Sequence, residues 1–485
     1  MKVAINGCCH GELDALYEML QQLEEKENIK VDLLICCGDF QSLRSEADLQ
    51  YFHAPPKYKK LKDFHLYFRG LKRAPRLTLL VGGNHEAPNV LRQLYYGGWL
   101  APNIFFLGYS GVVNVGGIRI AGLSGIYDKR HYHLGHFEKP PYNESTSRSA
   151  YHVREFELLK LHCIEGHVDI MLSHDWPEGI YEYGDKQSLL KRKPLFKNDI
   201  NNKCLGSPPS MALLKSMKPS FWFSGHLHVF FPAIYFHDKN LQTNFLALDK
   251  VLPGRSCLQV VDIHPKVPNK YLKRPSPQTN IQQTLTVEFD LEWLAILRAN
   301  QNRIPLSAQR CSNSVVCPSE EDRLAVLRKL REMFGEKKEK TKNENEKNKT
   351  KETKEETKEE IKEEAKGEIK EIKRDMKEEI NQITTKTYKD AKETNLEDRE
   401  ETKKNKNEKN EINKNEENPR EEDKTNQINP PFQDFAKQRK VILNIIGAQD
   451  KDPFADNPEE PRILPKGPPL VRRVEEEISL DLDEL

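Results

Sequence analysis

The sequence has no long hydrophobic run. None of its apolar stretches is long enough to span a bilayer, so we do not expect a membrane protein. Residues 1–5 also lack the pattern of a signal peptide, because they lead directly into a polar motif. A secreted or membrane-embedded protein is therefore not expected.

An excess of charge of one sign is also missing. The 76 Lys and Arg residues balance 75 Asp and Glu residues, so the net charge of +1 says little about partners until local patches are considered. Aromatic residues are almost absent from residues 336–430, where Tyr388 is the only one among many Lys, Glu, Asn and Thr residues. Such a composition cannot bury enough apolar surface to fold alone, and we predict a disordered linker.

Two short patterns interrupt this C-terminal region. Between Ile361 and Ile383 apolar residues recur at steps of three and four, which indicates a solitary charged helix or, despite Gly367, a weak coiled-coil seam. The apolar piece Val441–Ile446 lies in residues 431–485, which we otherwise predict to be a mostly disordered tail. A tail that binds splicing or RNA-turnover proteins is the alternative.

The nine cysteines do not indicate a disulfide framework. Four of them form two adjacent pairs at the ends of expected strands, which fits reduced thiols in a cytosolic or nuclear protein. Cys9, Cys36 and Cys37 are most simply small buried hydrophobic residues. Cys8 differs, because it stands among residues that bind metal ions.

Five polar clusters each follow an apolar run of the kind expected for a buried strand. Glycine accompanies most of them, as a sharp turn at a strand end requires. The clusters contain, in chain order, Cys8 with His10, Asp39, Asn84 with His85 and Glu86, His174, and finally His226 with His228. Residues i and i+2 of a strand share a face, so the last two histidines could reach one site. Strand ends that alternate with helices predict a layered α/β domain with a site at the carboxyl ends of its strands.

This ordered set resembles the calcineurin-like metallophosphoesterase superfamily, whose first motif is usually Asp-x-His where this chain has Cys8. The cysteine, with Gly-Asp-Phe-Gln-Ser-Leu-Arg at 38–44 and Phe-Leu-Ala-Leu-Asp-Lys at 245–250, is similar to one branch, the RNA lariat debranching enzymes. The resemblance extends to about Ile263 and more faintly to Phe334.

The resemblance implies an α/β fold: a layered β-sandwich of the metallophosphoesterase type, flanked by helices, with a small helical C-terminal part and a disordered charged tail. We expect a catalytic domain over residues 1–240, with a lariat recognition loop at 124–154, and a debranching-enzyme C-terminal domain over 241–335. In the latter we expect helical segments at Val287–Leu297 and Ser319–Phe334.

The resemblance also implies two divalent metal ions that share Asp39. One would be bound by Cys8, His10, Asp39 and His228, and the other by Asp39, Asn84, His174 and His226. A thiolate is a soft ligand, so the site should favour Fe²⁺ or Zn²⁺, with Mn²⁺ as an alternative. The competing interpretation is that Cys8 is not a ligand and that one ion binds well.

His85 has no place among these ligands. We assign it to the transition state, as a donor to phosphoryl oxygens or as the proton source for the leaving oxygen. Glu86 is expected to orient His85 or the backbone, while its structural alternative is a cap for the following segment.

Residues 124–154 form a long polar and aromatic loop, which is unusual unless it binds something. By resemblance it grips branched RNA, and the expected contacts are Tyr127, Tyr132, His136, Tyr142, Arg148, His152 and Arg154. Its histidines lack metal-motif spacing, so they are expected to be surface or hydrogen-bonding residues and not ligands.

Two basic segments have alternative interpretations. Between Tyr51 and Arg76 cations alternate with aromatic residues, as in surfaces for single-stranded RNA, although a solvated helix with buried aromatics fits equally. Residues 191–193, Lys-Arg-Lys, resemble a nuclear address or a phosphate contact.

The resulting hypothesis is a metal-dependent RNA phosphodiesterase that hydrolyses the 2'-5' branch-point bond of excised intron lariats, located in the nucleus and shuttling to the cytoplasm. The alternatives are a 3'-5' nuclease or a phosphoprotein phosphatase with the same motifs, or a scaffold of this fold without catalysis.

Overall fold

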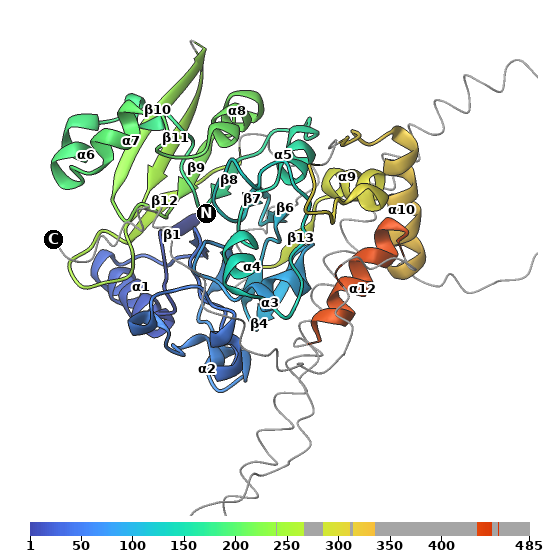
Figure 1. The fold of residues 1–485 in the computed structure, drawn as a ribbon, viewed down its shortest axis with the longest axis horizontal. Coiled ribbons are helices and arrows are strands. Elements are labelled where there is room, and N and C mark those ends of the chain that lie inside the picture. The colour runs from blue at the N-terminus through green and yellow to red at the C-terminus, as the bar shows by residue number, and fades with distance from the viewer. Residues whose placement is uncertain (239, 266–284, 311–313, 335–433, 449–453, 455–485) are drawn as a thin grey trace, which may run out of the picture. The chain divides into compact units, whose positions relative to one another are not determined.

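The computed structural model places residues 1–238, 240–265, 285–310, 314–334, 434–448 and 454 well enough to describe (Figure 1). The described residues all belong to one compact unit, Met1–Ala455. The expected linker at 336–430, its repeat at 361–383 and the acidic C-terminal end lie outside the described residues.

The first sheet has six strands in the order β12-β1-β2-β3-β5-β4. Its four central strands are parallel, and its two edge strands run antiparallel to their neighbours. In chain order the strands are β1 (Lys2–Asn6), β2 (Leu33–Cys36), β3 (Leu77–Leu80), β4 (Gly98–Ala101), β5 (Ile104–Phe106) and β12 (Leu258–Asp262).

The second sheet has seven strands in the order β10-β11-β9-β8-β7-β6-β13. Here β11, β9, β8 and β7 are parallel, so their carboxyl ends meet at one edge of the sheet. The strands are β6 (Ser110–Val115), β7 (Ile118–Leu123), β8 (Ile170–Ser173), β9 (Phe221–Ser224), β10 (Phe231–Asp238), β11 (Leu241–Ala247) and β13 (Val287–Phe289).

The main core lies between the two sheets. Alternate residues of β1 and β2, such as Val3 and Ile35, face Ile120, Ile170 and Phe223 of the second sheet, and all five are buried. Successive side chains of a strand point to opposite faces, so the other residues of β1 and β2 face outward and are covered by a helix. The expected layered sandwich is confirmed.

Helix α1 (Leu13–Glu27) covers the outer face of the first sheet. Its buried side chains Leu13, Leu16, Tyr17 and Leu20 recur at the spacing of a helix with one buried face. The other α-helices are α2 (Phe64–Phe68), α3 (Pro88–Leu91), α4 (Glu144–Ser149), α5 (Glu155–His162), α6 (Lys186–Arg192), α7 (Phe196–Asn201), α8 (Pro208–Met217), α9 (Leu291–Asn300), α10 (Glu320–Phe334) and α12 (Phe435–Ile446). Short 3₁₀ turns are η1 (Glu46–Gln50), η2 (Pro56–Tyr58), η3 (Arg92–Leu94), η4 (Ile180–Tyr183) and η5 (Gln301–Arg303).

The helical part after the sandwich differs from the prediction at its start. Val287–Phe289 is not helical but forms β13, which extends the second sheet by pairing with β6. Three residues carry too little pattern to distinguish a strand from a helix, and the available sheet edge decides. Helix α10 begins as predicted, because the Ser319 hydroxyl accepts a hydrogen bond from the Asp322 N–H at 3.2 Å and caps the helix.

Helix α12 packs against the body, although we predicted residues 431–485 to be mostly disordered. Phe435 belongs to the core cluster on the outer face of the first sheet. The Gln438 side-chain amide accepts a hydrogen bond from the Trp99 N–H of β4 at 2.7 Å and donates one to the Trp99 carbonyl at 2.9 Å. The Arg439 guanidinium donates to the Gln93 carbonyl at 2.7 Å. The edge strand β4 supplies backbone groups that a local pattern in the tail cannot reveal.

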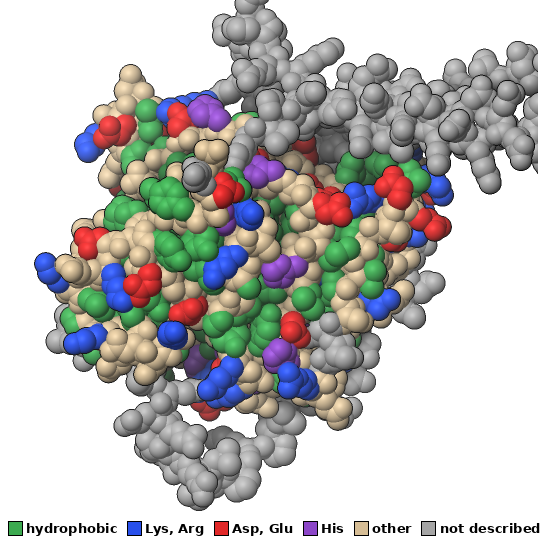
Figure 2. Space-filling view, turned by 90° about the horizontal axis from the view of Figure 1, so that it is seen from above, with side chains coloured by type: hydrophobic (Ala, Val, Ile, Leu, Met, Phe, Trp, Pro, Cys, Tyr) green, Lys and Arg blue, Asp and Glu red, His purple; other side chains and the backbone are tan. Residues whose placement is uncertain are grey.

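Within the described residues no helix is long and apolar enough to cross a membrane. On the face drawn in Figure 2, cationic and anionic side chains are interspersed with hydrophobic ones, as the near-zero net charge suggests. No large area of one sign is visible on that face among the described residues.

Candidate metal centre and recognition loop

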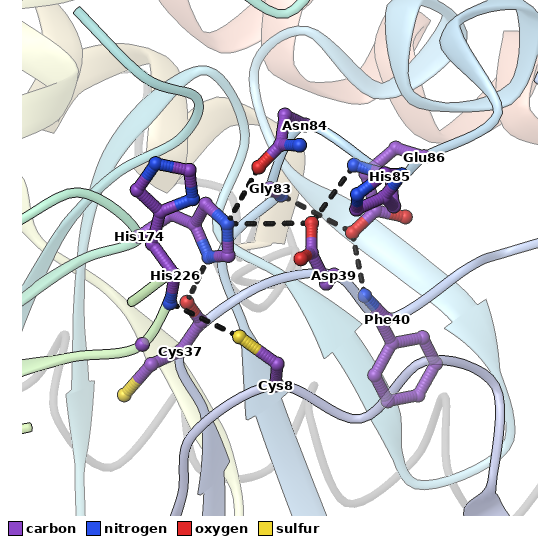
Figure 3. Close-up of polar contacts among 12 residues, drawn as sticks. Cys8, Cys37, Asp39, Phe40, Gly83, Asn84, His85, Glu86, His174 and His226 are labelled. Atoms are coloured by element: carbon purple, nitrogen blue, oxygen red, sulfur yellow. Dashed lines mark hydrogen bonds and ion pairs between the residues drawn. The ribbon is translucent and has the colours of Figure 1, made fainter. Parts of the chain in front are cut away.

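The turns after five parallel strands meet at one place. Cys8 and His10 follow β1, Asp39 follows β2, Asn84 and His85 follow β3, His174 follows β8, and His226 and His228 follow β9. Two sheets with their strand ends at the same side thus bring together residues from positions 8 to 228. Figure 3 shows Cys8, Asp39, Asn84, His174 and His226 among them. The structure brings together all seven candidate metal ligands.

One half of the centre consists of Cys8, His10, Asp39 and His228. One potential ligand atom of each lies within 4.8 Å of the others. His10 Nε2 lies 3.0 Å from His228 Nε2 and 3.7 Å from Asp39 Oδ2. The Cys8 sulfur accepts a hydrogen bond from the His226 N–H at 3.0 Å.

The other half is organised around His174. Its Nδ1 donates to the Cys37 carbonyl at 2.7 Å, which fixes the ring and turns Nε2 toward the centre. That Nε2 lies 3.1 Å from the Asn84 amide oxygen and 3.3 Å from Asp39 Oδ1. The His226 ring lies beside it, with the two ring centroids 5.0 Å apart. Asp39 therefore faces both halves, as a bridging ligand must.

The backbone takes unusual conformations at this site. Four residues have φ between 47° and 65°, in the left-handed region that residues other than glycine rarely adopt: His10, Asp39, His226 and His228. Strained residues of this kind cluster at functional sites, where the surrounding packing holds them.

Two glycines are required by close approach. A Cβ added to Gly83 would lie 2.1 Å from Asp39 Oδ1, and one added to Gly38 would lie 2.2 Å from His174 Nδ1. Both distances are far below van der Waals contact, so each position can hold only glycine while the ligands keep their places.

Burial controls protonation at the centre. It lowers the pKa of His10 to about 4 and that of His226 to about 3, and it lowers the pKa of His228 as well, so these imidazoles are neutral at pH 7. Burial, reinforced by the Asp39 carboxylate, raises the pKa of the Cys8 thiol. For Asp39, burial acts in the opposite direction, but the neighbouring histidines outweigh it and its pKa is lowered.

The donor set fits divalent metal ions. Asp39 is 1% exposed, and its ion-pair partners in the described part of the chain are His10 and His174. The His174 Nε2 faces two oxygens, while His10 and His228 direct nitrogens at each other. A cation placed among these oxygens, nitrogens and the thiol would give each of them a partner. Neutral imidazole, carboxylate, amide oxygen and thiolate are all metal ligands.

His85 lies at the rim of the centre and is held at two points. Its backbone N–H donates to Asp39 Oδ1 at 2.8 Å, and its Nδ1 donates to the His53 carbonyl at 3.2 Å. The ring is 5.5 Å from that of His10, between centroids. Because Nδ1 is used by the carbonyl, Nε2 is the nitrogen that remains to act on a substrate.

Glu86 holds the backbone, which is one of the two roles expected from the sequence. Its buried carboxylate accepts hydrogen bonds from the backbone N–H groups of Phe40, Gln41, Ser42 and Gly83, at 2.7 to 3.4 Å. Burial, with the Asp39 charge, raises its pKa to about 7. Glu86 fastens the loop that carries Asp39, so among the groups expected at the catalytic site it is a positioning residue that acts through the backbone.

The expected recognition loop folds over a buried polar interior. Tyr127, Tyr132, Tyr142 and Arg148 are partly exposed and can meet a substrate. The Tyr127 and Tyr132 rings are in contact, with centroids 5.5 Å apart. These four predictions are compatible with the structure.

Arg154 and His136 face inward, and their prediction as RNA contacts was wrong. Arg154 is fully buried, and its guanidinium donates to Glu138 at 2.5 Å and to the carbonyls of Gly135 and Ser149, each at 3.1 Å. His136 lies 3.1 Å from the buried Glu157 carboxylate. A sequence pattern shows that a loop is polar but does not show which polar side chains stabilise it from within.

His152 lies in a cluster that the spacing did not predict. Its Nδ1 is 2.9 Å from that of His131, which in turn is 3.3 Å from Asp128 Oδ1. The three residues have ligand atoms within 4.8 Å of one another. The Arg130 backbone N–H and guanidinium also donate to both oxygens of the Asp128 carboxylate, at 2.7 to 3.2 Å.

Sequence analysis missed the carbonyls that orient the histidines. Those of Cys37 and His53 belong to the backbone, and nothing in a residue pattern indicates which carbonyl faces an imidazole. It also missed the Gln41 amide, which lies 3.3 Å from His10 Nδ1 and comes to the site through a left-handed turn.

Two family models match the chain. Residues 1–230 match the model described as calcineurin-like phosphoesterase, and residues 240–458 match the model described as lariat debranching enzyme, C-terminal domain. The second match continues past Phe334, where the sequence analysis placed the end of the resemblance, and includes helix α12.

Several known proteins are similar to this chain in sequence. The lariat debranching enzyme of Arabidopsis thaliana is 49% identical over 333 residues, which cover 68% of this chain and 76% of that protein. The human lariat debranching enzyme is 50% identical over 317 residues (64% of this chain, 55% of that protein), and lariat debranching enzyme A of Xenopus laevis is 49% identical over 314 residues (64% and 56%). The chain spans little more than half the length of these last two relatives. The matched models and the Arabidopsis relative establish that this chain belongs to the lariat debranching enzyme family.

Proposed function

We propose that the protein is a metal-dependent phosphodiesterase that hydrolyses the 2'-5' bond at the branch point of excised intron lariats. The convergence of seven ligand side chains around Asp39 carries the hydrolytic part of this proposal. The relatives, which are named lariat debranching enzymes, support the branched substrate.

Each side chain of the centre has a task in this hydrolysis. Two divalent ions, when bound, would activate a water molecule and neutralise charge on the phosphate oxygens. Asp39 fixes the spacing of the two halves, and the Cys37 carbonyl keeps His174 turned toward them. His85 is held with Nε2 available, and in its protonated form it can give a proton to the leaving oxygen.

The metal preference follows from Cys8. Metal binding would deprotonate the buried Cys8 thiol, and the resulting thiolate is a soft donor, so we propose Fe²⁺ or Zn²⁺ as the native ions, with Mn²⁺ as a weaker substitute. Metal analysis of the purified protein tests this. In a Cys8→Asp variant, which restores the usual superfamily residue, activity should shift toward Mn²⁺, and an unchanged metal preference would contradict the role of Cys8.

The decisive assay compares branched and linear RNA of the same sequence. The protein should cleave the branched RNA at the 2'-5' bond and leave the linear RNA intact. Equal cleavage of both, as by a 3'-5' nuclease, or release of phosphate from phosphoproteins alone, would end the debranching proposal.

A His85→Ala variant separates an enzyme from a scaffold. It should lose on the order of 10²- to 10⁴-fold in activity and retain its metal content, because His85 contacts the centre through its backbone and not as a ligand. Activity equal to that of the unchanged protein would favour the scaffold.

We also propose that the protein is nuclear and shuttles to the cytoplasm. The exposed Lys191 and Arg192 of α6 support a nuclear address there. A fluorescent fusion should leave the nucleus when residues 191–193 are replaced by alanine, whereas an unchanged distribution would rule out this segment as the address.

A further inference from the structure

The basic segment Tyr51–Lys60 forms a wall of the catalytic centre. The His53 carbonyl accepts the hydrogen bond from His85, and the Phe52 ring meets the edge of the His85 ring with centroids 6.2 Å apart. The segment then continues through η2, where two prolines, Pro55 and Pro56, restrict the backbone before the exposed residues 57–60. A rigid exposed turn therefore starts directly beside the reacting position.

The same segment contacts the recognition loop. The rings of Tyr51 and Tyr142 are in edge contact, with centroids 5.5 Å apart. The pKa of His53 is lowered first by burial and then by the charge of Arg148 in α4, with a further contribution from Lys59. Arg148 of the loop and Lys59 of the basic segment thus both act electrostatically on His53, whose carbonyl holds His85, and the Arg148 guanidinium also pairs with Glu144 at 2.8 Å.

Eight Lys and Arg residues lie between positions 57 and 76. Three of them are neutralised by acids of the α1 region: Lys62 pairs with Glu12, Lys72 with Asp14, and Arg76 with Glu24. These pairs fasten the chain after residue 60 to the body.

Lys59 and Lys60 differ from these three. Both are exposed, and none of the ion pairs found within the described ranges includes either of them. Tyr58 is next to them, 37% exposed, with the Lys57 ammonium 4.8 Å from its ring centroid. Lys59 and Lys60 therefore carry uncompensated charge on the turn that starts beside His85.

We propose that Lys59 and Lys60, with Arg148 across from them, bind the phosphates of one RNA strand as it leaves the branch point. This inference rests on the proposed function, because the centre must hold a branch for a strand to pass over these residues. Lysine ammonium groups on a rigid turn suit a backbone of regularly spaced phosphates, and an exposed tyrosine ring offers a stacking surface for a base. The site would then bind by charge and stacking rather than by base sequence.

The test compares a branched trinucleotide with a branched RNA whose arms are about ten nucleotides long. In a Lys59→Ala/Lys60→Ala variant, KM for the long-armed RNA should rise about tenfold, and the dependence of log Kd on log salt concentration should become shallower by about 1.4, or 0.7 for each lost phosphate contact. Cleavage of the trinucleotide should be unchanged, because it has no arm to reach the two lysines.

A Lys191→Ala/Arg192→Ala variant is the matched control. It removes the same charge from α6, which packs beside η4 at the β10 edge of the second sheet, whereas the basic segment leads to α2 at the β4 edge of the first. This variant should bind both substrates like the unchanged protein. If both variants weakened binding of the long-armed RNA equally, the effect would come from overall charge and the proposal would fail. Unchanged binding of the long-armed RNA by the Lys59→Ala/Lys60→Ala variant would also overturn the proposal.

The test also separates this inference from the proposed function. If the unchanged protein cleaves neither branched substrate, debranching fails. Fluorescence anisotropy of labelled long-armed RNA still measures the surface in that case: a selective loss of binding in the Lys59→Ala/Lys60→Ala variant would retain the site, and no loss would reject it.

Discussion

Replacing Arg154 by methionine distinguishes a buried structural arginine from an RNA contact. The methionine side chain would keep much of the volume but remove the partner of Glu138, which is 5% exposed, and the donors to two backbone carbonyls. Removing one member of a buried ion pair costs about 3–5 kcal/mol, a large part of the roughly 5–15 kcal/mol that stabilises a typical domain. We therefore expect a clear decrease in the free energy of unfolding.

The assay is urea denaturation at pH 7, compared with an Arg130→Met control. Arg130 also pairs with a carboxylate, Asp128, but its side chain is 61% exposed, so its loss should cost less than about 1 kcal/mol. A second variant, Arg154→Met/Glu138→Gln, removes both charges of the buried pair and should regain part of the lost stability.

The opposite pattern would refute the reasoning. If Arg154 were an RNA contact, Arg154→Met would fold with unchanged stability and would show weaker RNA binding with a shallower salt dependence. A decrease in the free energy of unfolding of less than about 1 kcal/mol, with no recovery in the double variant, would mean that the buried Arg154–Glu138 pair does not stabilise the loop.

Three further predictions concern the metal centre, a buried ion pair and the C-terminal helix. Gly83→Ala should abolish metal binding and activity, because its Cβ would lie 2.1 Å from Asp39 Oδ1. Glu157→Gln should destabilise the protein at pH 7, because it leaves the buried Lys160 unpaired. Burial raises the pKa of Glu157, but Lys160 and His136 outweigh burial, and the pKa is lowered overall. The difference in free energy of unfolding between the variant and the unchanged protein should therefore be full at neutral pH and should narrow as the pH falls below about 4. Ending the chain at residue 334 should lower the melting temperature by several degrees, because it removes α12 from the outer face of the first sheet.

Each of these predictions has a direct check. Metal analysis and activity of Gly83→Ala are compared with those of Gly70→Ala, where nothing lies within 4 Å of the new Cβ although φ is positive. Retained metal in Gly83→Ala would contradict the close approach. Urea midpoints at several pH values test Glu157→Gln, and a difference that stays constant into acid would contradict the ion pair. For the truncation, an unchanged melting temperature would show that α12 does not contribute to the fold.

Local patterns predicted the elements that carry the chemistry. The apolar runs before residues 8, 39, 84, 174 and 226 are the strands β1, β2, β3, β8 and β9, and α10 begins at the position expected from its cap. Local patterns were insufficient where an element depends on a distant partner. Strand β13 exists because β6 offers an edge, and α12 packs where β4 and η3 present backbone groups.

The order of five glycine-associated polar clusters after apolar strands determined, without any coordinates, a layered α/β domain with Cys8, Asp39 and the three later histidines at one edge. Strand periodicity is local, and parallel strands place their ends together, so no long-range information was needed. Only the tertiary structure decided how each polar side chain is used. Arg154 and His136 stabilise the recognition loop from within, Glu86 holds the turn that carries Asp39, and Lys59 and Lys60 stay outside the ion pairs of the described chain. Burial and pairing depend on which distant acids and carbonyls come close in the folded chain, and neighbours in the sequence do not record that.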